Sequence, residues 1–352
     1  MYGIVIGFLM GNKPEYISRN FFGMITYLTY YILVDQISKK DLYKAIYVSS
    51  IIVISQNIVL VFIRDILSID IFTNGAVELI FGKLSSGAST GQERIYYPGQ
   101  MLIFGYTSLA ASRILSNQRL LPATNFSKNI VSRLLERLPI LKGITAILSF
   151  FVGIYVMVVV PASKGYLLGL IVLVLIIIAG LSFSFRKFKV KRGFLVFLFV
   201  TLGVSLFFLS SNYSNILSSI FDSEDISNAA RYDQLGYLLS DIHLFGNGLG
   251  AVLPDGYQRN SDLPYGFELT YINLLHKFGA LAILLYGGYL VTLIKSFQFL
   301  RKKDFPLEYS SYALGIMFFM FPSIGNPLLM NPQMILLHCV SLTLIRDAKY
   351  KS

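Results

Sequence analysis

The chain has 352 residues, of which 55% are hydrophobic and only 14% are charged. A soluble protein carries roughly a quarter charged residues, so this composition excludes an ordinary soluble enzyme and favours a membrane protein. The net charge of +11 at pH 7 fits basic loops that face anionic lipid better than it fits nucleic-acid binding.

Apolar segments recur along the whole chain, and a helix needs about twenty mostly apolar residues to cross a bilayer. The first ten residues, MYGIVIGFLM, are too short to cross alone and have the composition of part of a longer helix. The later segments that we expect to span the membrane are 21–37, 45–63, 99–115, 140–161, 166–185, 194–209, 271–297, 307–323 and 333–345. The sequence therefore predicts an all-α polytopic integral membrane protein, a single transmembrane domain over residues 1–352 with about nine or ten helices.

Basic residues orient these spans, because cytoplasmic loops are enriched in Lys and Arg. The connection RKFKVKRG at 186–193 carries five basic residues and no acid. Similar basic connections, which we also expect on the cytoplasmic side, are 39–44, 116–139, 301–304 and the C-terminal tail. The connections expected to face outward are then 64–98, 162–165, 210–270 and 324–332.

The outward loop 210–270 is long, and long loops of compact proteins are often functional. Its segment SNAARYDQLGYLLSD at 227–241 predicts a short helix, with apolar residues at helical spacing at Ala230, Leu235, Leu238 and Leu239. The following DIHLFGNGLG at 241–250 predicts a helix stop and a chain reversal. The segment PYGFELTYINLLHKFG then leads directly into the next span.

The glycine cluster in this loop does not have the pattern of a nucleotide site. Its spacing is G-x-G-x-G, no buried strand precedes it, and its predicted position is outside the cell, where nucleotide is scarce. The three histidines, His243, His276 and His338, lie far apart in sequence, and no Cys/His spacing fits zinc. The single Cys339 excludes a disulfide within the chain. We expect neither a metal nor a cofactor.

Three stretches together resemble the signature of the O-antigen ligase and polysaccharide polymerase superfamily: Arg231, then DIHLFGNGLG, then ELTYINLLHKFG. Upstream, PASKGYLLGLIVLVLIII at 161–178 resembles the Ser-Arg-Gly turn of that superfamily before an apolar helix. The resemblance covers roughly residues 140–297. The ligase branch usually has His-Asn where this chain has Glu268-Leu269, and Ser-Arg-Gly is here Ser163-Lys164-Gly165. The glutamate is more similar to the polymerase branch.

The resemblance implies an enzyme that transfers a glycan from a polyprenyl diphosphate to a sugar hydroxyl on the outer side of the bacterial cytoplasmic membrane, without metal. It implies a polymerase of repeat units for O-antigen, capsule or exopolysaccharide. The expected partners are the polyprenyl-diphosphate-linked oligosaccharide, membrane lipid, a chain-length regulator and a flippase, and no nucleic acid. Two alternatives stay open: a ligase that transfers finished glycan to lipid A core or protein, and a transporter of lipid-linked glycan.

The candidate catalytic residues are Arg231, whose guanidinium suits a diphosphate leaving group, and Glu268, which would act as base on the acceptor hydroxyl. His243 is a third candidate that would assist them. The residues that we expect to bind the diphosphate or the glycan are Arg94, Lys164, Arg259, Gly246 and Gly248. Ordinary structural roles also stay open, since Arg231 can pair with a neighbouring Asp and Glu268 can favour a helix N-terminus.

Overall fold

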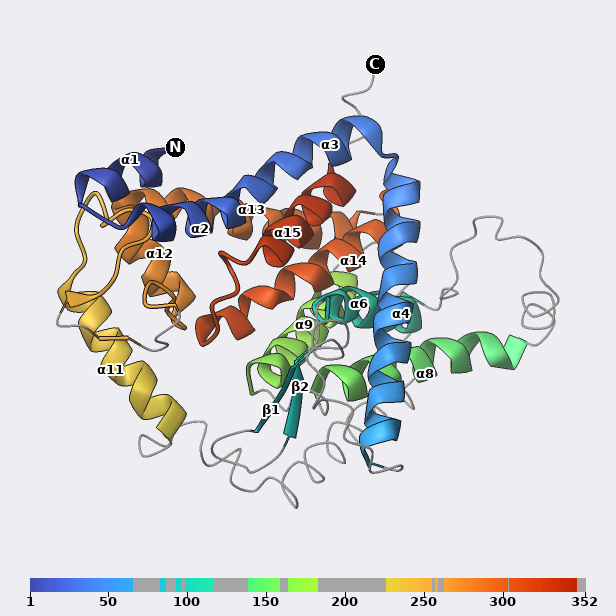
Figure 1. The fold of residues 1–352 in the computed structure, drawn as a ribbon. Coiled ribbons are helices and arrows are strands. Elements are labelled where there is room, and N and C mark those ends of the chain that lie inside the picture. The colour runs from blue at the N-terminus through green and yellow to red at the C-terminus, as the bar shows by residue number, and fades with distance from the viewer. Residues whose placement is uncertain are drawn as a thin grey trace.

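The computed structural model describes residues 1–65, 83–86, 93–96, 99–116, 139–158, 164–182, 226–254, 257–258, 263–302 and 304–346. This part of the chain is predominantly helical, as the sequence predicts (Figure 1). Within it, two helical stretches are long and apolar enough to cross a membrane by length and composition, Lys39–Leu60 and Thr270–Arg301. These two helices support membrane association.

The N-terminal helices are α1 (Tyr2–Leu9), α2 (Pro14–Ile25), α3 (Thr29–Gln36) and α4 (Lys39–Asp65). The helix over the expected span 21–37 therefore begins earlier, at Pro14, and it contains a 3₁₀ turn at Thr26–Leu28, between α2 and α3. Ser38 starts α4 as an N-cap, because its hydroxyl accepts from the amide of Asp41 at 3.1 Å and donates to the Asp41 carboxylate at 2.6 Å. The expected span 45–63 lies inside α4.

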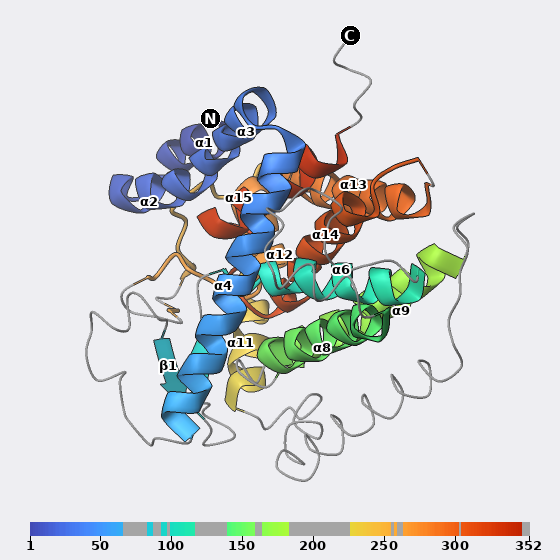
Figure 2. The same cartoon turned by 90° about the vertical axis from the view of Figure 1, so that its right-hand side faces the viewer.

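The central helix is α6 (Leu102–Ser116), which is buried on almost every side. It contacts α4, α8 (Pro139–Val158), α9 (Lys164–Ser182) and α14 (Leu307–Met317), and Figure 2 shows α4 crossing α6 and α8. Small residues allow the close approach of α6 and α14. A Cβ atom on Gly105 would lie only 2.5 Å from the Tyr312 ring, and one on Gly315 would overlap the carbonyl oxygen of Phe104.

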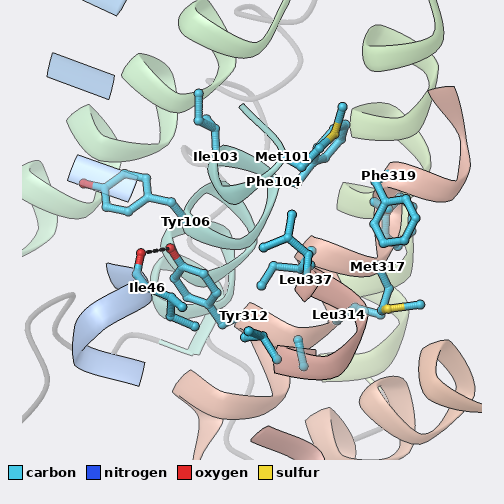
Figure 3. Close-up of a cluster of buried hydrophobic side chains, with 14 of the residues drawn as sticks. Ile46, Met101, Ile103, Phe104, Tyr106, Tyr312, Leu314, Met317, Phe319 and Leu337 are labelled. Carbon is cyan, nitrogen blue, oxygen red and sulfur yellow. Dashed lines mark hydrogen bonds between the residues drawn. The ribbon is translucent and has the colours of Figure 1, made fainter. Parts of the chain in front are cut away.

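Buried aromatic and aliphatic side chains from α4, α6, α14 and α15 (Pro332–Ile345) form the core around this contact (Figure 3). The Tyr312 hydroxyl donates to the carbonyl oxygen of Ile46 at 3.2 Å, which ties α14 to α4. A buried phenol needs such a partner, because an unpaired buried hydroxyl costs on the order of 1–3 kcal/mol. The core thus joins the N-terminal and C-terminal thirds of the chain.

Six further predicted spans, 99–115, 140–161, 166–185, 271–297, 307–323 and 333–345, coincide with helices in the described part of the chain, and two of them differ in detail. The span 271–297 is interrupted: α12 (Thr270–Phe278) and α13 (Ala282–Arg301) are joined by a 3₁₀ turn that begins at Gly279, whose φ is 56°. The span 307–323 is helical only to Met317 and continues as 3₁₀ turns. In the connection 64–98, which the sequence predicts to face outward, the structure adds an antiparallel pair of short strands, β1 (Lys83–Ser86) and β2 (Glu93–Tyr96). The predicted span 194–209 lies outside the described residues.

A nearly buried ion pair joins α6 to α14. Arg113 Nη2 lies 3.4 Å from Glu308 Oε1, and the two side chains are 5% and 26% exposed. We expect Glu308→Gln to lower the free energy of unfolding by about 1–3 kcal/mol, because it leaves a buried guanidinium without its carboxylate. Thermal unfolding of the purified protein in detergent measures this loss.

The matched control is Glu15→Gln, which removes an exposed ion pair. Glu15 Oε1 lies 2.7 Å from Arg19 Nη2, but the two side chains are 62% and 52% exposed. Exposed pairs contribute about 0–1 kcal/mol, so this variant should unfold close to the wild type. Equal unfolding temperatures for the Glu308 and Glu15 variants would contradict the importance of the buried pair.

Candidate functional site

The candidate site lies where α11 (Ile226–Ser240) packs beside α12. These helices run in the same direction, since Arg231 contacts Glu268 just before α12 and Asp241, just after α11, contacts His276 near the end of α12. The chain between them must therefore return along their full length. Figure 1 shows α12 close to α1 and α2, with α11 extending from there toward the lower edge of the view.

Arg231 and Glu268 form an ion pair, as a shared site requires. Arg231 Nε lies 3.2 Å from Glu268 Oε2, and the side chains are 32% and 27% exposed. Arg231 Nη1 also lies 3.5 Å from the Asn228 side-chain oxygen. A ligand can therefore reach a guanidinium and a carboxylate that already touch each other.

Gln234 fixes the backbone at Glu268, and sequence reasoning did not identify it. Its side-chain oxygen accepts from the amides of Glu268 at 3.0 Å and Leu269 at 3.1 Å, which satisfies amides at the start of α12. Gln234 and Leu238 form the buried stripe of α11, whereas Leu239, which the apolar spacing placed on that stripe, is exposed. The predicted helix is confirmed, but its predicted buried face is partly wrong, because a polar residue occupies a core position.

A third segment, Pro322–Asn326, completes the surroundings of the pair. Gly325 leaves room for the guanidinium, since a Cβ atom there would lie 3.3 Å from Arg231 Nε. The Thr270 hydroxyl donates to the carbonyl oxygen of Asn326, which attaches this segment to α12. Gly165, in the first turn of α9, packs against Pro322, so the backbone next to Lys164 lies beside the same segment.

The glycine turn, residues 246–250, pairs with backbone groups of the protein rather than with an anion. Gly246, Gly248 and Gly250 all have positive φ, at 72°, 78° and 77°, a conformation that glycine adopts without steric cost. The amides of Asn247 and Gly248 donate to the carbonyl oxygens of His276 at 2.8 Å and Lys277 at 2.9 Å. The turn therefore satisfies carbonyl groups at the C-terminal end of α12, which would otherwise lack partners.

This geometry corrects the expectation that Gly246 and Gly248 bind an anion. The Gly246 amide donates to the carbonyl oxygen of His243 at 2.9 Å, and the Gly248 amide donates to Lys277. Since each amide is already hydrogen-bonded inside the protein, neither is free to bind a diphosphate. The predicted chain reversal itself is confirmed.

His243 does not join the Arg231–Glu268 pair. Its Nε2 lies 3.5 Å from Asp241 Oδ1. Asp241 follows Arg231 by about ten residues, which corresponds to about 15 Å at the rise of an α-helix. Arg94 lies in β2 and Lys164 is the first residue of α9, but their side chains are outside what the structure describes. Arg259 also lies outside the described residues.

His276 and Lys277, both fully buried, attach the segment that follows α11 to the C-terminal end of α12. Lys277 Nζ donates to the carbonyl oxygens of Ala251 at 3.3 Å and Tyr265 at 3.1 Å, and lies 5.3 Å from the centre of the Phe267 ring. These contacts attach both Ala251 and Tyr265 to the C-terminal end of α12. Their role is structural, because solvent does not reach either side chain.

No family model, curated protein or solved structure matches the chain. In the described ranges, no three His, Cys, Asp or Glu side chains are grouped to hold a metal ion. The chemistry of the site is therefore deduced from its own residues, which are a guanidinium beside a carboxylate, both partly open to solvent.

Proposed function

We propose that the protein is a polytopic membrane glycosyltransferase that joins polyprenyl-diphosphate-linked oligosaccharide units on the outer face of the bacterial cytoplasmic membrane. The observation that carries this proposal is the contact between Arg231 and Glu268, two residues 37 positions apart in sequence. The distribution of basic connections and the two long apolar helices support the membrane topology. The motif resemblance supports the substrate class.

The pair suits displacement of a diphosphate by a sugar hydroxyl. The acceptor oxygen forms a bond to the anomeric carbon, and the bond from that carbon to the diphosphate oxygen breaks with its electron pair. Arg231 stabilises the charge that develops on the diphosphate, since guanidinium binds phosphate oxygens bidentately. The hydroxyl proton passes to Glu268. The resting ion pair holds the two groups side by side, and the diphosphate then competes for Arg231.

A polymerase is favoured over a ligase because the position after the glycine turn carries Glu268-Leu269 rather than the His-Asn of the ligase branch. A carboxylate at this point provides a base that needs no histidine. We propose that the product is a repeat-unit polymer of the O-antigen, capsule or exopolysaccharide kind.

Deletion of the gene tests this proposal against the two alternatives. Surface and lipid-linked glycans from the deletion strain are separated by size on gels. Loss of a polymerase leaves single-repeat glycan on the surface, whereas loss of a ligase leaves full-length polymer on the polyprenyl carrier. Loss of a transporter leaves single lipid-linked units on the cytoplasmic side. Either of the last two patterns would contradict the proposal.

A further inference from the structure

A pocket of about 500 Å³ lies at the opposite end of α11 from Arg231. It is formed between the connection from α1 to α2 and the segment that follows α11, and its volume is in the range of small-molecule sites. The polar and aromatic residues that line it are Asn12, Lys13, Tyr16, Asp241, His243, Asn247, Tyr257 and Gln258. The proposed reaction assigns no role to this pocket.

The carboxylate in the pocket is held in place by buried partners. Asp241 Oδ2 lies 2.8 Å from Nε2 of the fully buried His276, and accepts from the side-chain amide of Asn247 at 3.1 Å. The other oxygen, Oδ1, lies 3.5 Å from His243 Nε2. A carboxylate has about four lone-pair sites, so Asp241 keeps the capacity to accept from a ligand while its position is fixed.

This set of groups fits a carbohydrate. The Asp241 carboxylate and the side-chain oxygen of Asn12 can accept from sugar hydroxyls, while Lys13 and His243 can donate to them. Tyr16 and Tyr257 add aromatic rings to the lining, and each ring also packs against a second tyrosine, Tyr265 and Tyr237 respectively. Such rings suit a ligand that is apolar on its ring faces and polar at its edge. A polyphosphate would be repelled by Asp241, so the pocket disfavours the diphosphate and favours the sugar part of a substrate.

Tyr257 connects the pocket to the reactive pair. Its hydroxyl donates at 3.1 Å to the carbonyl oxygen of Ala230, the residue before Arg231, and its ring centre lies 4.6 Å from that of Tyr237. Tyr257 therefore lies between the pocket, which it lines, and the part of α11 that carries Arg231. The separation of about 15 Å along the helix suits an oligosaccharide rather than a single sugar.

We infer that this pocket binds an oligosaccharide, several sugars away from the reacting hydroxyl. Its role as the acceptor subsite rests on the proposed glycosyltransferase function, but its affinity for carbohydrate does not. The pocket would hold the growing or incoming glycan so that one end reaches Glu268. Binding energy from such a remote site raises the rate only when it positions the reacting groups.

The test measures direct binding to the full-length protein in lipid nanodiscs. The probe is the repeat-unit oligosaccharide released by mild acid from the surface polysaccharide of the source cells, and saturation-transfer NMR and calorimetry report its binding. We expect a variant with both Lys13→Ala and His243→Ala to bind at least tenfold more weakly. Both side chains are exposed, so the variant should fold and melt as the wild type does.

Two controls separate this inference from the proposed function. Arg19→Ala changes an exposed basic residue on the same helix as Tyr16 but outside the pocket lining, and should leave binding unchanged. Glu268→Gln should also bind the probe normally while failing to extend it when the polyprenyl-diphosphate-linked donor is supplied. Wild-type protein that binds no probe at millimolar concentration, or a pocket variant that binds it normally, would overturn the inference. Extension that persists in Glu268→Gln would instead defeat the proposed reaction and leave the carbohydrate pocket standing.

Discussion

Cells that carry Arg231→Ala or Glu268→Gln are expected to lose the ladder of long glycan chains and to retain single repeat units. Removing a preorganised cation at a leaving group costs about 10²–10³ in rate, and removing a general base costs about 10²–10⁴. Either loss suffices to abolish visible extension. The measurement is the distribution of chain lengths on gels, with the amount of membrane-inserted protein determined on the same samples.

If the pair had only a structural role, the variants would lose membrane-inserted protein together with the ladder. We expect the ladder alone to be lost. Partly exposed ion pairs contribute about 0–1 kcal/mol to stability, so both variants should be inserted and should melt close to the wild type. Arg231→Lys keeps the charge but loses the planar fork that binds phosphate bidentately, and should still be defective. Asp233→Asn, an exposed acid on the same helix, is the matched control and should give a normal ladder. A normal ladder from either Arg231→Ala or Glu268→Gln would remove that residue from the mechanism.

The helices could be predicted from sequence because burial in protein and burial in lipid both select long apolar segments. This is why α4, α6, α8, α9 and α15 lie where the hydropathy pattern placed them. The chain reversal at 246–250 was also predictable, because closely spaced glycines favour positive φ. The interruption at Gly279 was not, since an apolar pattern continues through it.

The partners within the site could not be predicted in the same way. Gln234 is a polar residue in a core position, and its purpose is visible only once the amides of Glu268 and Leu269 are beside it. Gly325 matters because it approaches Arg231 from a segment almost a hundred residues further along the chain. Asp241 likewise depends on His276. Contacts of this kind depend on tertiary packing, which has no local sequence period.

The glycine turn gives the largest expected effect on stability. Gly248 has φ of 78°, and a Cβ atom there would overlap the backbone nitrogen and Cα of Gly7 in α1. The next amide, that of Leu249, donates to the carbonyl oxygen of Gly3 at 2.8 Å. We expect Gly248→Ala to cost about 2–5 kcal/mol, because left-handed backbone strain and overpacking act at the same position. Thermal unfolding in detergent should show a drop of several degrees.

Gly236→Ala is the matched control for this change. Gly236 lies within α11 and is exposed, and a Cβ atom there would meet no neighbour within 4 Å among the described residues outside its own helix backbone. Alanine there should leave stability unchanged or raise it by up to about 1 kcal/mol, since alanine favours a helix. If Gly248→Ala unfolded at the same temperature as Gly236→Ala, α1 would not pack on the turn. A destabilised turn would also release the C-terminal end of α12 and the wall of the pocket at Asp241. Gly248→Ala should therefore weaken oligosaccharide binding in the protein that remains folded.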